Sequence, residues 1–201
     1  FVQAYQQEKL RKTFEIAAQT PFYKKRDILS TPVQHIPFIN KETVLAEGNN
    51  MLISTSGADY VTTGGTSGKP LGFYINKNRK GFEWYWMTNN WGKTGFKITD
   101  YRAVLRNHRL NGKQFGKDPL LREYQYDNFS LTPGYLDFIV DHINQHNLHY
   151  LHAYPSAAYV FASHLKKNNL QTSLKAFFCG SENILPQQKQ LIQSELKYRM
   201  Y

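Results

Sequence analysis

Helical and strand-like segments alternate through the last third of the 201-residue chain, and this alternation is the strongest constraint on its fold. In order, they are the helix 133–147, the strand 148–154, the helix 155–169, the strand 174–180 and the helix 185–197. The helices have apolar residues at 3.6-residue spacing, and the strands are short apolar runs. Short links between such segments require right-handed crossovers, which predicts an α/β fold with a helix-covered parallel sheet.

The first two thirds are less regular. We predict a helix over 5–19 that Pro21 ends, and a short helix from about Lys41 that Asn40 caps. The further predictions are strands at 49–55, 59–63, 71–76 and 101–107, a helix at 79–95 and an irregular basic excursion over 107–131. The chain contains no repeat or linker, so 1–201 is interpreted as a single α/β unit. Its parts are a helical and connecting segment (1–50), a glycine-loop subregion (51–131) and βα repeats (132–201).

Charge and composition exclude several classes of function. The formal net charge of +10 attracts polyanions, but the basic residues are scattered, which argues against a dedicated nucleic-acid surface. The single cysteine, Cys179, excludes an internal disulfide and a cysteine-rich metal site, and is typical of the cytoplasm. No apolar stretch approaches the ~20 residues needed to cross a bilayer, so no membrane span is predicted.

The stretch VTTGGTSGKPLGFY, residues 61–74, concentrates glycines and hydroxyl side chains between two strand-like runs. Gly64, Gly65 and Gly68 leave backbone N–H groups free to form an anion nest, and Lys69 adds a positive charge. Hydroxyl donors to phosphate oxygens are available from Thr62, Thr63, Thr66 and Ser67. A flexible hairpin tip is the alternative, but a plain tip needs only one or two turn residues.

Two common phosphate loops do not fit this stretch. In the Walker pattern, Thr63 stands where the first glycine belongs, Pro70 replaces the magnesium-binding hydroxyl, and a strand follows where a helix should begin. The dinucleotide fingerprint fails on glycine spacing. The residues therefore predict a phosphate-binding loop that joins strand to strand.

TGGTSGKPLG resembles the T-S-G-T-T-G-x-P-x-G loop of adenylate-forming enzymes, the superfamily of acyl-CoA synthetases and firefly luciferase. AAQTPFYKKR with IPFINKETV, HAYPSAAYVFA, and FFCGSENILPQQKQLI are similar to the phenylacetate–CoA ligase and CapK capsule-biosynthesis branch, in the same order. Gly64 in place of the usual Ser is a departure from the superfamily loop. The resemblance spans nearly the whole chain but only about the first half of the family's length. It implies a truncated N-terminal part of a larger enzyme, inactive alone.

The resemblance also implies the activity. It implies an ATP-dependent ligase that joins a carboxylic acid to AMP and then transfers the acyl group to coenzyme A or another acceptor, with a role in capsule or polysaccharide biosynthesis. ATP would carry Mg²⁺, whose protein ligand is expected outside this chain, as is the C-terminal catalytic Lys. Lys69 would stabilise the departing pyrophosphate electrostatically. Alternatives are a non-catalytic nucleotide- or polyanion-binding module and, more weakly, a nucleic-acid binder.

Particular residues follow from that resemblance. The nucleotide is expected at Thr63, Gly64, Gly65, Thr66, Ser67, Gly68, Lys69, Gly180, Ser181 and Glu182. The last three match the family segment that lies against adenine, although an ordinary turn with Ser or Asn as helix cap is the alternative. Tyr154, Pro155 and Ser156 are candidate walls of the acyl pocket, unless they simply open a helix.

Three further sets of residues are given structural interpretations. The aromatic run Phe82, Trp84, Tyr85, Trp86 and Trp91 is interpreted as core, with an aryl-acid pocket as the alternative. His149 and His152, three apart in a strand, face opposite sides, so no metal site is predicted there. Cys179, in an apolar strand, is interpreted as buried and unreactive.

Overall fold

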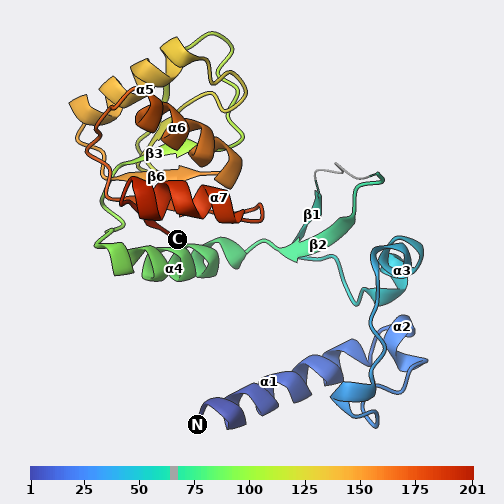
Figure 1. Cartoon of the computed structure of the whole chain (residues 1–201). Helices are drawn as coiled ribbons and strands as arrows, with labels where there is room; N and C mark the ends of the chain where they lie inside the picture. Colours follow the sequence, from blue (N-terminus) through green and yellow to red (C-terminus); the bar gives the residue numbers. More distant parts are fainter. Residues whose placement is uncertain (64–67) are drawn as a thin grey trace. The chain divides into compact units, whose positions relative to one another are not determined.

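The computed structural model describes residues 1–63 and 68–201 (Figure 1). Contacts divide the chain into two compact units, Phe1–Glu83 and Trp84–Tyr201, and each is described by itself.

The second unit is built on a six-stranded sheet with the order β4-β5-β3-β6-β7-β8. The strands are β3 (Arg102–Leu105), β4 (Gly116–Asp118), β5 (Glu123–Gln125), β6 (Tyr150–Ala153), β7 (Ala176–Cys179) and β8 (Arg199–Met200). All neighbouring pairs are parallel except β4 and β5, which are antiparallel. The predicted α/β fold with a helix-covered parallel sheet is confirmed, with one antiparallel strand added at an edge.

Helices connect the parallel strands, as the alternation predicts. They are α5 (Pro133–Gln145), α6 (Pro155–Lys167) and α7 (Pro186–Lys189), which continues as the π-helical segment η4 (Gln190–Glu195). Pro133, Pro155 and Pro186 each occupy the first turn, where the missing N–H is harmless. Among the described residues, no helix is both long and apolar enough to span a membrane.

The sheet is covered on both faces, and β6 and β7 show how. Leu151 and Phe177 point to the larger core, which α5, α6 and η4 complete. Tyr150 and Phe178 point to a smaller core made with Trp91 and Phe96. This alternation follows from the two-residue period of a strand. Because both faces of the sheet are covered, every residue of β6 is buried.

The first unit contains short helices and one strand pair. Its elements are α1 (Val2–Ala17), α2 (Pro21–Lys24), η1 (Val33–His35), α3 (Lys41–Glu47), η2 (Gly48–Met51), β1 (Ala58–Thr62) and β2 (Gly72–Asn76). The Asn40 side chain accepts a hydrogen bond from the Thr43 N–H at 2.9 Å, so the predicted cap of α3 is confirmed. β1 and β2 pair antiparallel, with Thr62 opposite Gly72. The predicted strand–loop–strand is therefore confirmed.

Three sequence predictions are wrong, each for a local reason. The segment 49–55 is not a strand, because the 3-10 turn of η2 runs through Met51. The stretch 107–131 is not irregular throughout, since it supplies β4 and β5.

The aromatic side of α4 (Arg79–Trp91) is only partly core. Trp91 is buried and Trp84 packs against the same smaller core. Phe82, Tyr85 and Trp86 are exposed by 73%, 61% and 61%, so the prediction of a wholly buried aromatic face is wrong for them.

Candidate functional site

Three neighbouring parallel strands of the second unit end side by side, and the residues that follow them form the candidate site. β3, β6 and β7 are adjacent in the sheet. Arg106 follows β3, Tyr154 follows β6 and Gly180 follows β7. We call the residues Arg106, Tyr154–Ser156 and Gly180–Glu182 the carboxyl edge. Ligands of open α/β sheets collect at such edges.

Glu182 joins two segments of the carboxyl edge directly. Its carboxylate accepts hydrogen bonds from the backbone N–H of Ser156 at 3.0 Å and from the Ser156 hydroxyl at 3.1 Å. The first N–H groups of a helix lack partners within it and favour negative charge, and the N-cap Tyr154 supplies no side-chain bond to α6. Glu182 therefore stabilises the start of α6 from a different loop.

The GSEN segment, residues 180–183, does not cap the helix that follows it. The N-cap of α7 is Leu185, so Ser181 and Asn183 do not cap that helix. The capping residue is the glutamate, and the helix that it caps is α6.

Arg106 joins the third segment to the other two. One guanidinium nitrogen, Nη1, lies 2.5 Å from Nε2 of His152, and the other, Nη2, donates to the Ser181 hydroxyl at 2.8 Å. The guanidinium carbon also lies 5.1 Å from the centroid of the Tyr154 ring, within the range of a cation–π contact. Sequence reasoning gave Arg106 no role. The signal that could have found it is a basic residue directly after the apolar run Ala103–Leu105.

His152 is buried and serves as an acceptor. Burial first, and then the positive charges of Arg106 and Arg102, lower the pKa of His152 from 6.5 to about 3. Because an arginine only donates, Nε2 accepts the bond and the ring proton is on Nδ1. The ring lies 4.9 Å from that of Trp91, which closes the apolar side.

This depressed pKa makes the stability of the fold dependent on pH. An unfolded His152 gains a proton as the pH falls through 6.5, whereas the folded one stays neutral down to about 3. The free energy of unfolding is therefore highest above pH 6.5, as far as His152 determines it, and declines as the pH falls below that value. At pH 5 we expect a loss of about 2 kcal/mol relative to pH 7. Urea unfolding at both values, with the wild type and His152→Gln, measures it.

His152→Gln keeps an acceptor for Arg106 and removes the titration, so its stability should change less between the two pH values. His142 contributes in the same direction, because burial and then His146 lower its pKa too. If the free energy of unfolding changed equally between the two pH values in the variant and the wild type, the pH dependence could not be assigned to His152.

Ser181 has a backbone φ of +70°, the left-handed region that side chains other than glycine rarely adopt. Such a conformation costs on the order of 1 kcal/mol and persists where neighbouring contacts hold it. The bond from Arg106 to the Ser181 hydroxyl is such a contact. Cys179, two residues earlier, is half-buried, and burial raises its pKa to about 12, consistent with the interpretation of this thiol as unreactive.

The glycine loop lies in the first unit, between β1 and β2. Backbone N–H of Thr63 donates to the carbonyl of Leu71 at 2.9 Å, and N–H of Leu71 donates to the Thr63 hydroxyl at 3.0 Å. Gly68 has φ +126°, and Lys69 is exposed. The predicted ligands Gly64, Gly65, Thr66 and Ser67 lie outside the described residues.

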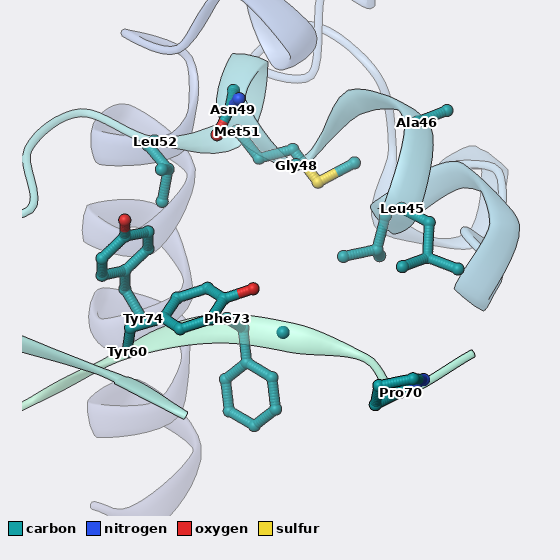
Figure 2. A pocket seen from close by; sticks show the side chains of 12 residues that line it. Leu45, Ala46, Gly48, Asn49, Met51, Leu52, Tyr60, Pro70, Phe73 and Tyr74 are labelled. Carbon is teal, nitrogen blue, oxygen red and sulfur yellow. The ribbon is translucent and has the colours of Figure 1, made fainter. Parts of the chain in front are cut away.

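A pocket of about 340 Å³ lies beside this strand pair (Figure 2). Residues of α3, η2, β1 and β2 line it, among them Leu45, Met51, Leu52, Tyr60 and Tyr74. Figure 2 shows the Phe73 ring on the opposite side of β2 from Leu52.

Gly72 explains how one wall of that pocket is built. A Cβ atom on Gly72 would lie 1.8 Å from the Tyr60 hydroxyl, so glycine lets the Tyr60 ring cover the strand. The ring then meets that of Tyr74 edge-on, with 5.1 Å between the centroids. Sequence reasoning did not find this pocket, because its walls come from four separate short elements.

No protein-family model matches the chain, and no curated protein is significantly similar to it in sequence. Among solved structures, it is similar to 2-hydroxyisobutyryl-CoA ligase in complex with 2-HIB-AMP and CoA. In the thioesterification state the TM-score is 0.62 with 18% identity, over 96% of this chain and 46% of that one. The chain therefore shares the fold of part of that ligase.

An open conformation of the same ligase gives a TM-score of 0.61 with 16% identity, over 96% of this chain and 47% of that one. The postadenylation state of the ligase with 2-HIB-AMP gives a TM-score of 0.61 with 17% identity, over 96% of this chain and 46% of that one. The chain thus spans about half the length of the ligase that it matches.

Proposed function

We propose that this chain is part of an ATP-dependent ligase that converts a carboxylic acid to its acyl-adenylate and then transfers the acyl group to coenzyme A or another acceptor. The observation that carries the proposal is the fold match over 96% of the chain, in a protein whose glycine loop joins two paired antiparallel strands. We also propose membership of the phenylacetate–CoA ligase and CapK branch, a role in capsule or polysaccharide biosynthesis and a cytoplasmic location.

In the first step, a carboxylate oxygen attacks the α-phosphorus of ATP. The bond from that phosphorus to the oxygen bridging to the β-phosphate breaks, and its electron pair leaves with pyrophosphate. Negative charge therefore grows on the departing group, where backbone N–H groups and Lys69 stabilise it. The Thr63 hydroxyl accepts from the Leu71 N–H, so its own proton is available to a phosphate oxygen.

The carboxyl edge takes the other parts of the substrates in this proposal. Gly180 and Ser181 lie against adenine, and Tyr154–Ser156 form a wall of the acyl pocket. Glu182 contributes by fixing these two segments to each other through Ser156.

Mg²⁺ would accompany ATP and neutralise phosphate charge. No group of three or more His, Cys, Asp or Glu side chains in the described part of the chain could hold the ion. We propose that its protein ligand lies outside this chain.

ATP–pyrophosphate exchange by the full-length protein, measured against a panel of carboxylic acids, tests the proposal. Gly68→Val combined with Lys69→Ala should lower the exchange rate at least about 100-fold, the effect typical of a lost oxyanion donor. Valine is strained at the φ of +126° found for Gly68, and alanine removes the charge of Lys69.

Lys77→Ala is the matched control, because Lys77 is another exposed lysine of the same unit. It should leave exchange unchanged. Undiminished exchange in the double variant would contradict the role of the loop. ATP binding without exchange for any acid would favour a non-catalytic nucleotide-binding module.

A further inference from the structure

We infer that Arg106 is an oxyanion-binding residue, whose guanidinium binds phosphate or carboxylate oxygens of the ligand at the carboxyl edge. The inference rests on the proposed function for the identity of that ligand. It gives Arg106 a direct contact with that ligand.

The first support is charge. Arg106 is half-buried, and both of its hydrogen-bond partners, His152 and Ser181, are neutral. Among residues 1–63 and 68–201, it forms no ion pair with an acidic side chain. A partly desolvated cation without a counter-ion is unfavourable, and an anionic ligand offsets that cost.

The one acidic side chain of the carboxyl edge is already engaged. Glu182 uses one carboxylate oxygen for the N–H of Ser156 and the other for the Ser156 hydroxyl. These bonds hold the carboxylate on α6 and leave the guanidinium to a ligand.

The second support is geometry. A guanidinium has five N–H donors in a planar fork that matches carboxylate and phosphate oxygens. His152 and Ser181 take one donor each, which leaves three for a ligand. Their bonds also fix the orientation of the fork before any ligand arrives, so little side-chain entropy is lost on binding.

The third support is position. Arg106 contacts the ring of Tyr154 and the hydroxyl of Ser181, which belong to the two segments proposed for the acid and for adenine. A carboxylate and an α-phosphate meet where these parts of the substrates join. The shared chemistry is an oxyanion, and its two sources are the phosphate of the nucleotide and the carboxylate of the acid.

Calorimetric titration of the full-length protein with AMP and with adenosine separates the phosphate contact from the nucleoside contacts. If the phosphate is the source, Arg106→Gln should weaken the binding of AMP about 10- to 100-fold and leave the affinity for adenosine unchanged. If the carboxylate is the source, the variant should raise the KM of the exchange-supporting acid by a similar factor and leave AMP unchanged. Arg106→Lys, which keeps the charge without the fork, should show a smaller loss than Arg106→Gln in either case.

Arg109→Gln is the matched control. It removes one positive charge from the same loop region, and Arg109 also covers an aromatic ring, that of Phe129 at 4.8 Å. It should leave each affinity unchanged. Thermal unfolding of each variant shows whether the fold is kept. If Arg106→Gln does not fold, the affinities and the KM are measured with Arg106→Lys instead.

Three results would overturn the inference. They are unchanged AMP affinity and acid KM in the Arg106 variants, an equal weakening of AMP and adenosine, and a wild type that binds neither AMP nor inorganic phosphate and supports no exchange. A protein that binds inorganic phosphate through Arg106 but supports no exchange would uphold the inference and overturn the proposed function.

Discussion

Replacing Glu123 by Gln is expected to lower the free energy of unfolding by about 3–5 kcal/mol, because it leaves Arg102 charged, buried and unpaired. Arg102 on β3 and Glu123 on β5 are 2% and 7% exposed and form an ion pair across neighbouring strands. Arg102 also donates to the carbonyl of Leu121 at 2.9 Å. Urea unfolding at neutral pH measures the effect.

The double variant Arg102→Met with Glu123→Leu is the control for that experiment. It removes both charges and keeps similar volumes, so it should be far more stable than Glu123→Gln alone. A single variant that unfolds within about 1 kcal/mol of the wild type would contradict a paired, desolvated Arg102.

Trp91→Ala is expected to cost about 3–5 kcal/mol, because this ring is the centre of the smaller core. It stacks on Phe178 with 4.5 Å between the centroids and packs edge-on against Phe96 at 5.4 Å. Its contact with His152 gives a second readout. Removing the indole admits water to the imidazole, so the pKa of His152 should rise from about 3 toward its ordinary value.

Chemical unfolding measures the stability of the variant, and NMR titration of the histidine ring measures the pKa. Trp86→Ala is the matched control, since Trp86 lies on the same helix but is 61% exposed. It should change stability by no more than about 0.5 kcal/mol. A Trp91→Ala protein as stable as the wild type would contradict the packing described.

The fold could be predicted wherever a local pattern decides it. The helices α5 and α6 and the strands β6 and β7 follow from apolar spacing, and the glycine loop is flanked by two short apolar runs. β5 could not be found in this way, because a buried ion pair joins its first residue, Glu123, to Arg102 of β3. In the sequence Glu123 is merely a charged residue, and its partner Arg102 is 21 positions away.

The sequence likewise predicts some residues of the candidate site and not others. Gly180–Glu182 and Tyr154–Ser156 could be predicted because each follows a recognisable strand, and adjacent parallel strands bring them together. Arg106 could not be predicted as part of the site, because its position there depends on hydrogen bonds to a neutral His152 and to Ser181. Ser181 lies 75 positions further along the chain. The exposure of the rings on α4 could not be predicted, because helical spacing shows which residues share a face and does not show what covers that face.

The two hydrogen bonds from Glu182 to Ser156 have a consequence for how this protein changes through evolution. They join positions 26 residues apart, so the start of α6 depends on a side chain in another loop. A lineage that loses the carboxylate leaves the first turn of that helix without its acceptor, and selection then favours a new cap at or beside residue 154. In homologous proteins, substitutions at these two places should therefore be inherited as a pair.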